Sequence, residues 1–170
     1  MNDFQVVQNA PSIGKRYVIF DLDGTLALIH KRRQVADLGG GKIDWDKFFD
    51  PANIQLDEPN VPVIQMAQLL HANGLQVIIL SGRSKRTKAE TAKWLDDNKV
   101  PYHVLKMRPD DESGEGHWHF MSDNTLKQHW LDTLFEDKDE IFGVFDDRNQ
   151  VVDMWRDNGL TCFQVADGNF

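Results

Sequence analysis

One short segment, Tyr17-Val-Ile-Phe-Asp-Leu-Asp-Gly-Thr-Leu26, joins an apolar run to two carboxylates. The apolar run at 17–20 predicts a buried strand, and Gly24 interrupts the strand just after Asp21 and Asp23. Open parallel sheets bind their ligands beyond the carboxyl ends of their strands. The two carboxylates would point to opposite sides of an ideal strand, but a turn at Gly24 can bring both to one small site.

Two interpretations of this segment are open. In the functional one, Asp21 is a carboxylate nucleophile that also binds a metal ion, and Asp23 is the acid/base beside it. In the other, the strand ends in a solvated Asx turn. The D-x-D-G-T spacing directly after an apolar strand favours the functional interpretation.

Composition limits the class of protein. The chain has 170 residues, 41% of them hydrophobic and 27% charged, which predicts one globular α/β domain without a disorder signature. The single cysteine, Cys162, excludes an internal disulfide and predicts a buried core thiol. No apolar stretch reaches membrane length and the N-terminus lacks a signal-peptide pattern, so we expect a cytoplasmic protein without a membrane partner.

The net charge of −8 argues against a broad nucleic-acid-coating surface, because a phosphate backbone would be repelled. It does not exclude an enzyme that holds one strand end with a local basic cluster. Part of the acidity belongs to the proposed site, where bound Mg²⁺ would offset it.

The order of predicted elements indicates a three-layer, Rossmann-like parallel sheet, with residues 1–170 forming a single domain. Residues 15–29 and 59–170 would form the core, and the polar segment 30–58 a flap or small cap. We expect strands at 17–20, 75–80, 101–107, 141–145 and 161–165, helices at 60–72, 87–98, 122–136 and from about 151 to Gly159, and loops at 1–15 and 108–119. Inward-facing residues would include Val63, Met66, Ala67, Leu70, Trp94, Leu126, Trp130, Leu131, Leu134 and Trp155.

Reactive side chains repeatedly follow the predicted strands. Beside Asp21 and Asp23, the segments Ser81-Gly-Arg83 and Asp146-Asp-Arg148 end two strands, and Asp123 and Lys127 begin a helix. Together they would supply a nucleophile, an acid/base, phosphate-oxygen donors, a cation and metal carboxylates, which is a phosphoryl-transfer site. Each part alone has a plainer explanation: an exposed helix ion pair at 123 and 127, a helix N-cap at 146–147 or at Ser81, and a solvated charge run at 31–33.

This motif set resembles the haloacid dehalogenase superfamily of phosphohydrolases. The first motif of that family matches Asp21 to Thr25, the second matches Ser81, the third matches Lys127, and the acidic pair of the fourth matches Asp146 and Asp147. All four occur in order. The resemblance therefore implies the fold described above and a phosphatase activity.

Residues 145–156 and 163–170 more closely resemble the 3′-phosphatase domains of bacteriophage polynucleotide kinase/phosphatases. Arg32, Arg83, Arg108, Asp123 and Lys127 match further residues of that family. The P-loop motif of the kinase half does not occur, so the resemblance implies a phosphatase without 5′-kinase activity. It implies a nucleic-acid 3′ end or a nucleotide as the substrate. We predict no protein partner from the sequence.

The expected mechanism is that of an Mg²⁺-dependent phosphomonoesterase with an aspartyl-phosphate intermediate. A small-molecule nucleotidase or sugar phosphatase is the alternative enzyme, and an inactive phospho-ligand-binding module is the alternative from another class. The expected catalytic residues are Asp21, Asp23, Ser81, Lys127 and Asp123, the last orienting the Lys127 ammonium. The expected metal ligands are Asp21, Asp23 through its backbone carbonyl, and Asp146 or Asp147. The expected substrate-binding residues are Thr25, Arg32, Gly82, Arg83, Arg108 and Arg148.

Two aromatic segments remain outside this scheme. His117-Trp-His119 lacks a third ligand at a suitable spacing, so we expect a surface loop there and not a transition-metal site. Trp45, Phe48 and Phe49 have two open explanations: they stack a nucleobase, or they anchor the cap to the core.

Overall fold

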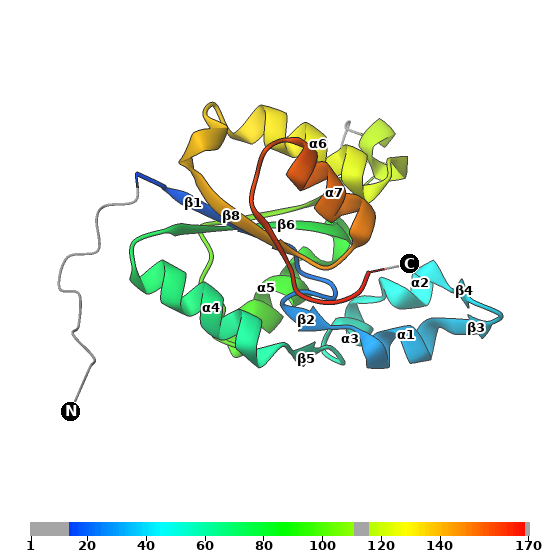
Figure 1. Cartoon of the computed structure of the whole chain (residues 1–170). Helices are drawn as coiled ribbons and strands as arrows, with labels where there is room; N and C mark the ends of the chain where they lie inside the picture. Colours follow the sequence, from blue (N-terminus) through cyan, green and yellow to red (C-terminus); the bar gives the residue numbers. More distant parts are fainter. Residues whose placement is uncertain (1–13, 111–115, 169–170) are drawn as a thin grey trace.

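The computed structural model describes residues 14–110 and 116–168, and its centre is a five-stranded parallel sheet (Figure 1). The strand order is β7-β6-β1-β8-β9. The strands are β1 (Tyr17–Phe20), β6 (Gln76–Ser84), β7 (Val104–Arg108), β8 (Ile141–Asp146) and β9 (Cys162–Gln164). The predicted α/β class with a parallel sheet is confirmed.

Helices cover both faces of the sheet (Figure 1). Alternate residues of β1 point to opposite faces, so Val18 and Phe20 pack in one core cluster and Ile19 in the other. The first cluster includes residues of α4 (Val61–Ala72) and α5 (Lys88–Asp97), and the second includes residues of α6 (Asp123–Leu134) and α7 (Asn149–Asp157). The predicted core tryptophans Trp94, Trp130 and Trp155 are all buried.

The strand order changes direction at β1. From β1 the chain builds outward to β6 and β7 on one side, and β8 and β9 occupy the other side. Phe20, the last residue of β1, is in register with Ile79 of β6 and Phe145 of β8. The residues that follow β1 and end β8 therefore lie side by side, at the kind of switch point where open α/β sheets bind ligands.

A cap of small elements, residues 30–58, is inserted between β1 and α4 and lies beside one end of the sheet (Figure 1). It contains α1 (His30–Ala36), β3 (Asp37–Gly39), β4 (Lys42–Ile43), α2 (Trp45–Phe48) and α3 (Pro51–Ile54), and it is flanked by the pair β2 (Ala27–Leu28) and β5 (Glu58–Pro59). The cap has its own small core, in which Ala36 and Phe48 are buried with Ile29.

Several local expectations were wrong. Met66 and Leu134 were expected to face inward, but Met66 is 40% exposed and Leu134 is 43% exposed. Met66 lies off the arc formed by Val63, Ile64 and Ala67, and Leu134 is the last residue of its helix. The segment 108–119 was expected to be a loop throughout. Its first residue, Arg108, instead ends β7, and a 3₁₀ helix, η2, spans Gly116–Phe120. Most of the expected lead-in at 1–15 lies outside the described residues.

The strand β6 also continues past its predicted end at Leu80. Its pairing with β7 shifts between Ser81 and Ser84, so the segment at 82–83 is a bulge in the strand. The bulge displaces Gly82 and Arg83 from the regular strand alternation. In the described part of the chain, no helix has the length and apolar character needed to cross a bilayer.

Candidate active site

Asp21 and Asp146 are held together by a buried ammonium group. The Nζ of Lys127, which reaches down from α6, donates to Asp21 Oδ1 at 2.6 Å and to Asp146 Oδ2 at 2.8 Å. All three side chains are buried. Trp155 Nε1 also donates to Asp146 Oδ2 at 3.1 Å, which fixes that carboxylate from the side of α7. The alternative of an exposed ion pair between residues 123 and 127 is therefore wrong.

Asp147 completes a group of three carboxylates, which we call the acid cluster: Asp21, Asp146 and Asp147. Ligand oxygens of the three residues lie within 4.8 Å of one another. Thr25 Oγ1 donates to Asp147 Oδ1 at 3.3 Å. Gly24 has φ +88°, and a Cβ there would lie 2.1 Å from Asp147 Oδ2. The D-G-T turn therefore needs glycine both for its backbone conformation and for the close approach of Asp147.

The acid cluster has more negative than positive charge. Burial raises the pKa of Asp21 well above its usual value; Lys127 offsets part of this, and Asp146 and Asp147 raise it further. Burial, with the charge of Asp146, also raises the pKa of Asp147 to about 6. Burial alone would lower the pKa of Lys127, but the charges of Asp146 and Asp21 raise it above its usual value. A set of carboxylate oxygens with one ammonium suits a bound hard cation such as Mg²⁺.

Asp23 belongs to a second buried group, which we call the arginine cluster: Asp23, Asp57, Arg32 and Arg83. Arg32 Nη2 and Arg83 Nε each donate to Asp23 Oδ1 at 2.6 Å. The same guanidinium groups donate to Asp57, from Arg32 Nε to Oδ1 at 2.9 Å and from Arg83 Nη2 to Oδ2 at 2.5 Å. Two carboxylates thus face two guanidinium groups.

The arginine cluster keeps Asp23 ionised. Burial alone would raise the pKa of Asp23, but the charges of Arg32 and Arg83 lower it below its usual value. Burial raises the pKa of Asp57 to about 6, and Arg83 and Arg32 oppose that shift. The carboxylate of Asp23 is 21% exposed, whereas that of Asp57 is fully buried, so Asp23 is the member that faces the pocket.

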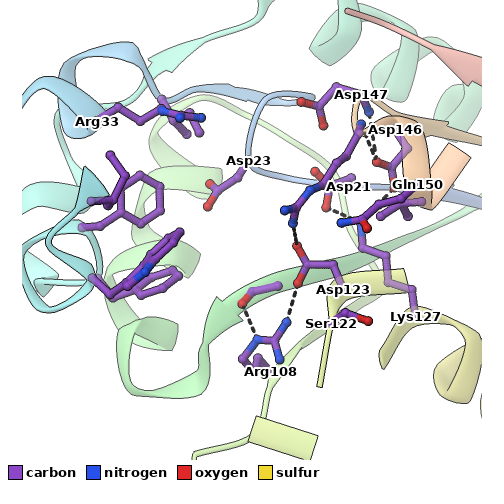
Figure 2. A pocket seen from close by; sticks show the side chains of 18 of the residues that line it. Asp21, Asp23, Arg33, Arg108, Ser122, Asp123, Lys127, Asp146, Asp147 and Gln150 are labelled. Carbon is purple, nitrogen blue, oxygen red and sulfur yellow. Dashed lines mark hydrogen bonds and ion pairs between the residues drawn. The ribbon is translucent and has the colours of Figure 1, made fainter. Parts of the chain in front are cut away.

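A third charged group, the mouth clamp, consists of Asp123, Arg108 and Arg148; Figure 2 shows Asp123 and Arg108 facing each other. Arg148 Nη1 donates to Asp123 Oδ2 at 2.6 Å, and Arg108 Nη2 donates to Asp123 Oδ1. Arg108 also donates to the backbone carbonyl of Gly82 at 3.0 Å. A Cβ on Gly82 would lie 2.6 Å from Asp123 Oδ1, so glycine allows this close approach. Asp123 was expected to orient the Lys127 ammonium; its carboxylate bonds the two arginines, and its charge helps to raise the pKa of Lys127.

The acid cluster, Asp23 and the mouth clamp open into one pocket of about 560 Å³ between the strand ends and the cap. Figure 2 shows Asp23 between Arg33 of the cap and the acid cluster. The volume is in the range of small-molecule sites. The site therefore combines a buried carboxylate next to an ammonium, a candidate metal position and the ionised carboxylate of Asp23 in one cavity.

Four predicted site residues lie behind the pocket surface. The side chains of Thr25, Arg32, Ser81 and Arg83 are fully buried, and none of them lines the pocket in the described part of the chain. Thr25, Arg32 and Arg83 were expected to contact the substrate directly, but their side chains bond carboxylates of the protein instead. Thr25 bonds Asp147, and both arginines bond Asp23 and Asp57. Ser81 Oγ accepts from the backbone N–H of Arg83 at 3.2 Å, within the bulge.

Asp57 was missed by the sequence analysis. It lies in Leu56-Asp-Glu-Pro59, within the segment assigned to the cap, and no motif marks it. Its role depends on two arginines that lie 25 and 26 residues away in the chain. His117 and His119 lie in η2, and the group of possible metal-binding side chains found among the described residues is the acid cluster.

Comparisons with known proteins agree with this geometry. A family model for the phosphatase domain of polynucleotide kinase PNKP matches residues 15–170. A protein of Autographa californica nuclear polyhedrosis virus, whose name assigns it as a bifunctional polynucleotide kinase/RNA ligase, is 28% identical over 98% of this chain and 22% of its own length.

Two solved structures are also similar. A chain from the structure of a Pnkp1/Rnl/Hen1 complex is 30% identical with a TM-score of 0.71, covering 100% of this chain and 52% of that one. A dehalogenase, at 12% identity and a TM-score of 0.59, covers 89% of this chain and 84% of its own and shares the fold. The present chain thus spans about half of the solved relative and about a fifth of the viral one.

Proposed function

Because the chain belongs to the family of polynucleotide kinase phosphatase domains, within the haloacid dehalogenase-like phosphatases, we propose that it removes 3′-phosphate groups from polynucleotide ends or 3′-nucleotides through an aspartyl-phosphate intermediate. One observation carries the proposal most directly. The carboxylate of Asp21 lies against Lys127 in a cluster of three buried carboxylates that opens into the pocket. A phosphomonoester is itself negatively charged, so a carboxylate can attack it only where cations offset the repulsion.

Asp21 would act as the nucleophile. Its attack on phosphorus forms an aspartyl-phosphate bond and breaks the bond between phosphorus and the 3′-oxygen of the nucleotide. Mg²⁺ held by Asp21, Asp146 and Asp147, and by the backbone carbonyl of Asp23, would supply positive charge beside the attacking carboxylate and the phosphate. Lys127 holds the Asp21 carboxylate in place and adds a second positive charge.

Asp23 would transfer the protons. It gives a proton to the leaving 3′-oxygen, then takes one from the water that attacks the aspartyl-phosphate and releases inorganic phosphate. Without substrate Asp23 is ionised, because Arg32 and Arg83 lower its pKa. A phosphate dianion bound beside it would raise that pKa and favour the acid form needed in the first step. Arg32, Arg83 and Asp57 would position Asp23 without touching the substrate.

The mouth clamp would contact the rest of the substrate. Arg108 and Arg148 converge on Asp123 at the edge of the pocket, and guanidinium groups bind phosphates well. Gly82 lines the same edge, where its backbone N–H can bind a phosphate oxygen, and Ser81 would hold the bulge that presents it. A local basic group of this kind suits a strand end even in a chain whose net charge is −8.

A panel of phosphate substrates tests the proposal. The protein is assayed with Mg²⁺ and with EDTA on a 3′-phosphorylated oligonucleotide, the matching 5′-phosphorylated oligonucleotide, nucleoside 3′- and 5′-monophosphates, sugar phosphates and a chromogenic phosphomonoester. We expect Mg²⁺-dependent release of phosphate, with 3′-phosphates preferred. A preference for 5′-nucleotides or sugar phosphates would support the small-molecule phosphatase instead, and no hydrolysis of any ester would support a binding module.

Two further expectations concern activity and assembly. We propose that residues 1–170 carry no 5′-kinase activity, because they contain no P-loop motif. The expectation of no protein partner stays a prediction. The solved relative comes from a complex with Rnl and Hen1, so light scattering and co-purification are suitable tests of it.

A further inference from the structure

The pocket has two different walls. The wall formed by the strand ends carries the acid cluster, Asp23 and the mouth clamp. The wall formed by the cap is mostly apolar and aromatic, with Ile43, Trp45, Phe48 and Phe49. Phosphate chemistry uses only the charged wall, so the proposed reaction leaves the aromatic wall without a function.

The three aromatic residues of the cap differ in what they do. Phe48 is 6% exposed, stands edge-on to both Trp45 and Phe49, and lies under the guanidinium of Arg32 at 4.3 Å. Phe48 therefore packs inside the cap, against Arg32 of the arginine cluster. Trp45 is 61% exposed although it lines the pocket. Of the two explanations left open by the sequence, nucleobase stacking therefore suits Trp45 better than Phe48.

Trp45 is held in a defined position. It is the first residue of α2, whose N-cap Asp44 accepts from the backbone N–H of Lys47 at 3.2 Å. Its ring packs edge-on against Phe48 at 5.5 Å and lies nearly parallel to Phe49, with 19° between the ring planes and 5.9 Å between the centroids. A preorganised aromatic ring loses little side-chain freedom when it binds a flat ligand.

We propose that Trp45 is the stacking platform for the nucleobase of the nucleotide that carries the 3′-phosphate. This inference rests on the proposed function, because the phosphate at Asp21 fixes where the sugar and base must lie. Trp45 and Asp21 line the same cavity, and its volume of about 560 Å³ accommodates a nucleoside 3′-phosphate. Every base has a π face, so Trp45 would select for the presence of a base and not for its identity.

The experiment compares a normal substrate with one that lacks the base. Two 3′-phosphorylated oligonucleotides are used, one ending in an ordinary nucleotide and one ending in an abasic tetrahydrofuran residue. Wild type, Trp45→Ala and Trp45→Phe are assayed for kcat and KM on both. Leu38→Ala is the matched control, because Leu38 is an exposed apolar residue of the same cap that does not line the pocket. Phe48→Ala shows how loosened packing within the cap changes kcat and KM on both substrates.

We expect Trp45→Ala to lower kcat/KM on the normal substrate by about 5- to 150-fold, mainly through KM, the range expected for loss of one base–aromatic stack. Trp45→Phe should recover part of this loss. On the abasic substrate, Trp45→Ala and wild type should be equal within about twofold. Leu38→Ala should match wild type on both substrates.

Equal losses for Trp45→Ala on the two substrates, as in Phe48→Ala, would overturn the inference, because Trp45 would then only hold the cap. No loss on either substrate would overturn it as well. In both cases wild-type hydrolysis of the 3′-phosphorylated oligonucleotide leaves the proposed function standing. If wild type hydrolyses neither oligonucleotide but does hydrolyse other phosphomonoesters, the proposed function and the platform both fail.

Discussion

Two buried charge clusters lie side by side after β1, and they are built in opposite ways. The arginine cluster sets two carboxylates against two guanidinium groups and is complete within the protein. The acid cluster sets three carboxylates against one ammonium group. A balanced buried network can be rigid, whereas an unbalanced one is costly until another cation enters. The difference supports the proposal that the first cluster positions a catalytic group and that the second binds the metal and performs the chemistry.

The largest effect is expected at Asp21. Asp21→Asn should lower kcat on the order of 10⁴- to 10⁶-fold, because the amide cannot form the aspartyl-phosphate. In EDTA the same variant should melt at a higher temperature than wild type, since one of three buried like charges is removed. Phosphate-release kinetics and thermal melting measure the two effects. Unchanged activity would remove Asp21 as the nucleophile.

Asp23 should show a dependence on the leaving group. Asp23→Asn should lower kcat on a 3′-phosphorylated oligonucleotide by about 10²- to 10⁴-fold, the usual contribution of general acid–base catalysis. The loss should be smaller on a chromogenic aryl phosphate, whose leaving group needs no proton. Equal losses on the two substrates would contradict the role of Asp23 as the acid in the first step.

The arginine cluster should contribute more to the stability of the fold than the acid cluster does. Asp57→Ala leaves Arg32 and Arg83 with one carboxylate between them, and should destabilise the fold by about 3–5 kcal/mol. Urea unfolding measures the change. Asp97→Ala is the matched control, because Asp97 is half exposed in an ion pair with Lys93, and its loss should cost less than about 1 kcal/mol. An unchanged free energy of unfolding in Asp57→Ala would show that the arginine cluster does not support the fold.

Metal addition should act on one cluster and not on the other. Mg²⁺ at about 100 times its dissociation constant should stabilise wild type by about 2.7 kcal/mol, or roughly 5–10 °C in melting temperature. Asp147→Asn should reduce this shift, whereas Asp57→Asn should keep it. An equal loss of the shift in both variants would mean that the two clusters are not independent.

The smallest effect is a pH dependence at Asp57. Its pKa in the folded protein is about 6 against an ordinary value of 3.8, so the folded state binds the proton more tightly than the unfolded state. Wild type should therefore gain stability relative to Asp57→Asn as the pH falls from about 7 to about 5, on the order of 1 kcal/mol. Urea unfolding of both proteins at pH 7 and pH 5 measures the difference, and the opposite sign would contradict the raised pKa.

Much of the fold and part of the candidate site could be predicted from residues close together in the chain. The apolar runs before Asp21 and Asp146 predict strands, and parallel strands bring their carboxyl ends to one edge, so these carboxylates were expected to meet. Lys127 was expected near them from the order of the motifs. The exposed positions of Met66 and Leu134 could not be predicted, because apolar character alone does not say where a helix face ends.

Local periodicity and the order of the predicted strands are enough to predict the parallel α/β fold and the set of acidic and basic residues gathered at one edge of the sheet. Which of these charges pair with one another follows from the three-dimensional arrangement alone. Arg32 and Arg83 bond Asp23 and Asp57 instead of lining the pocket, and Asp123 bonds Arg108 and Arg148 instead of Lys127. Such pairings depend on distances of a few ångströms between residues far apart in the chain, and no local pattern encodes them.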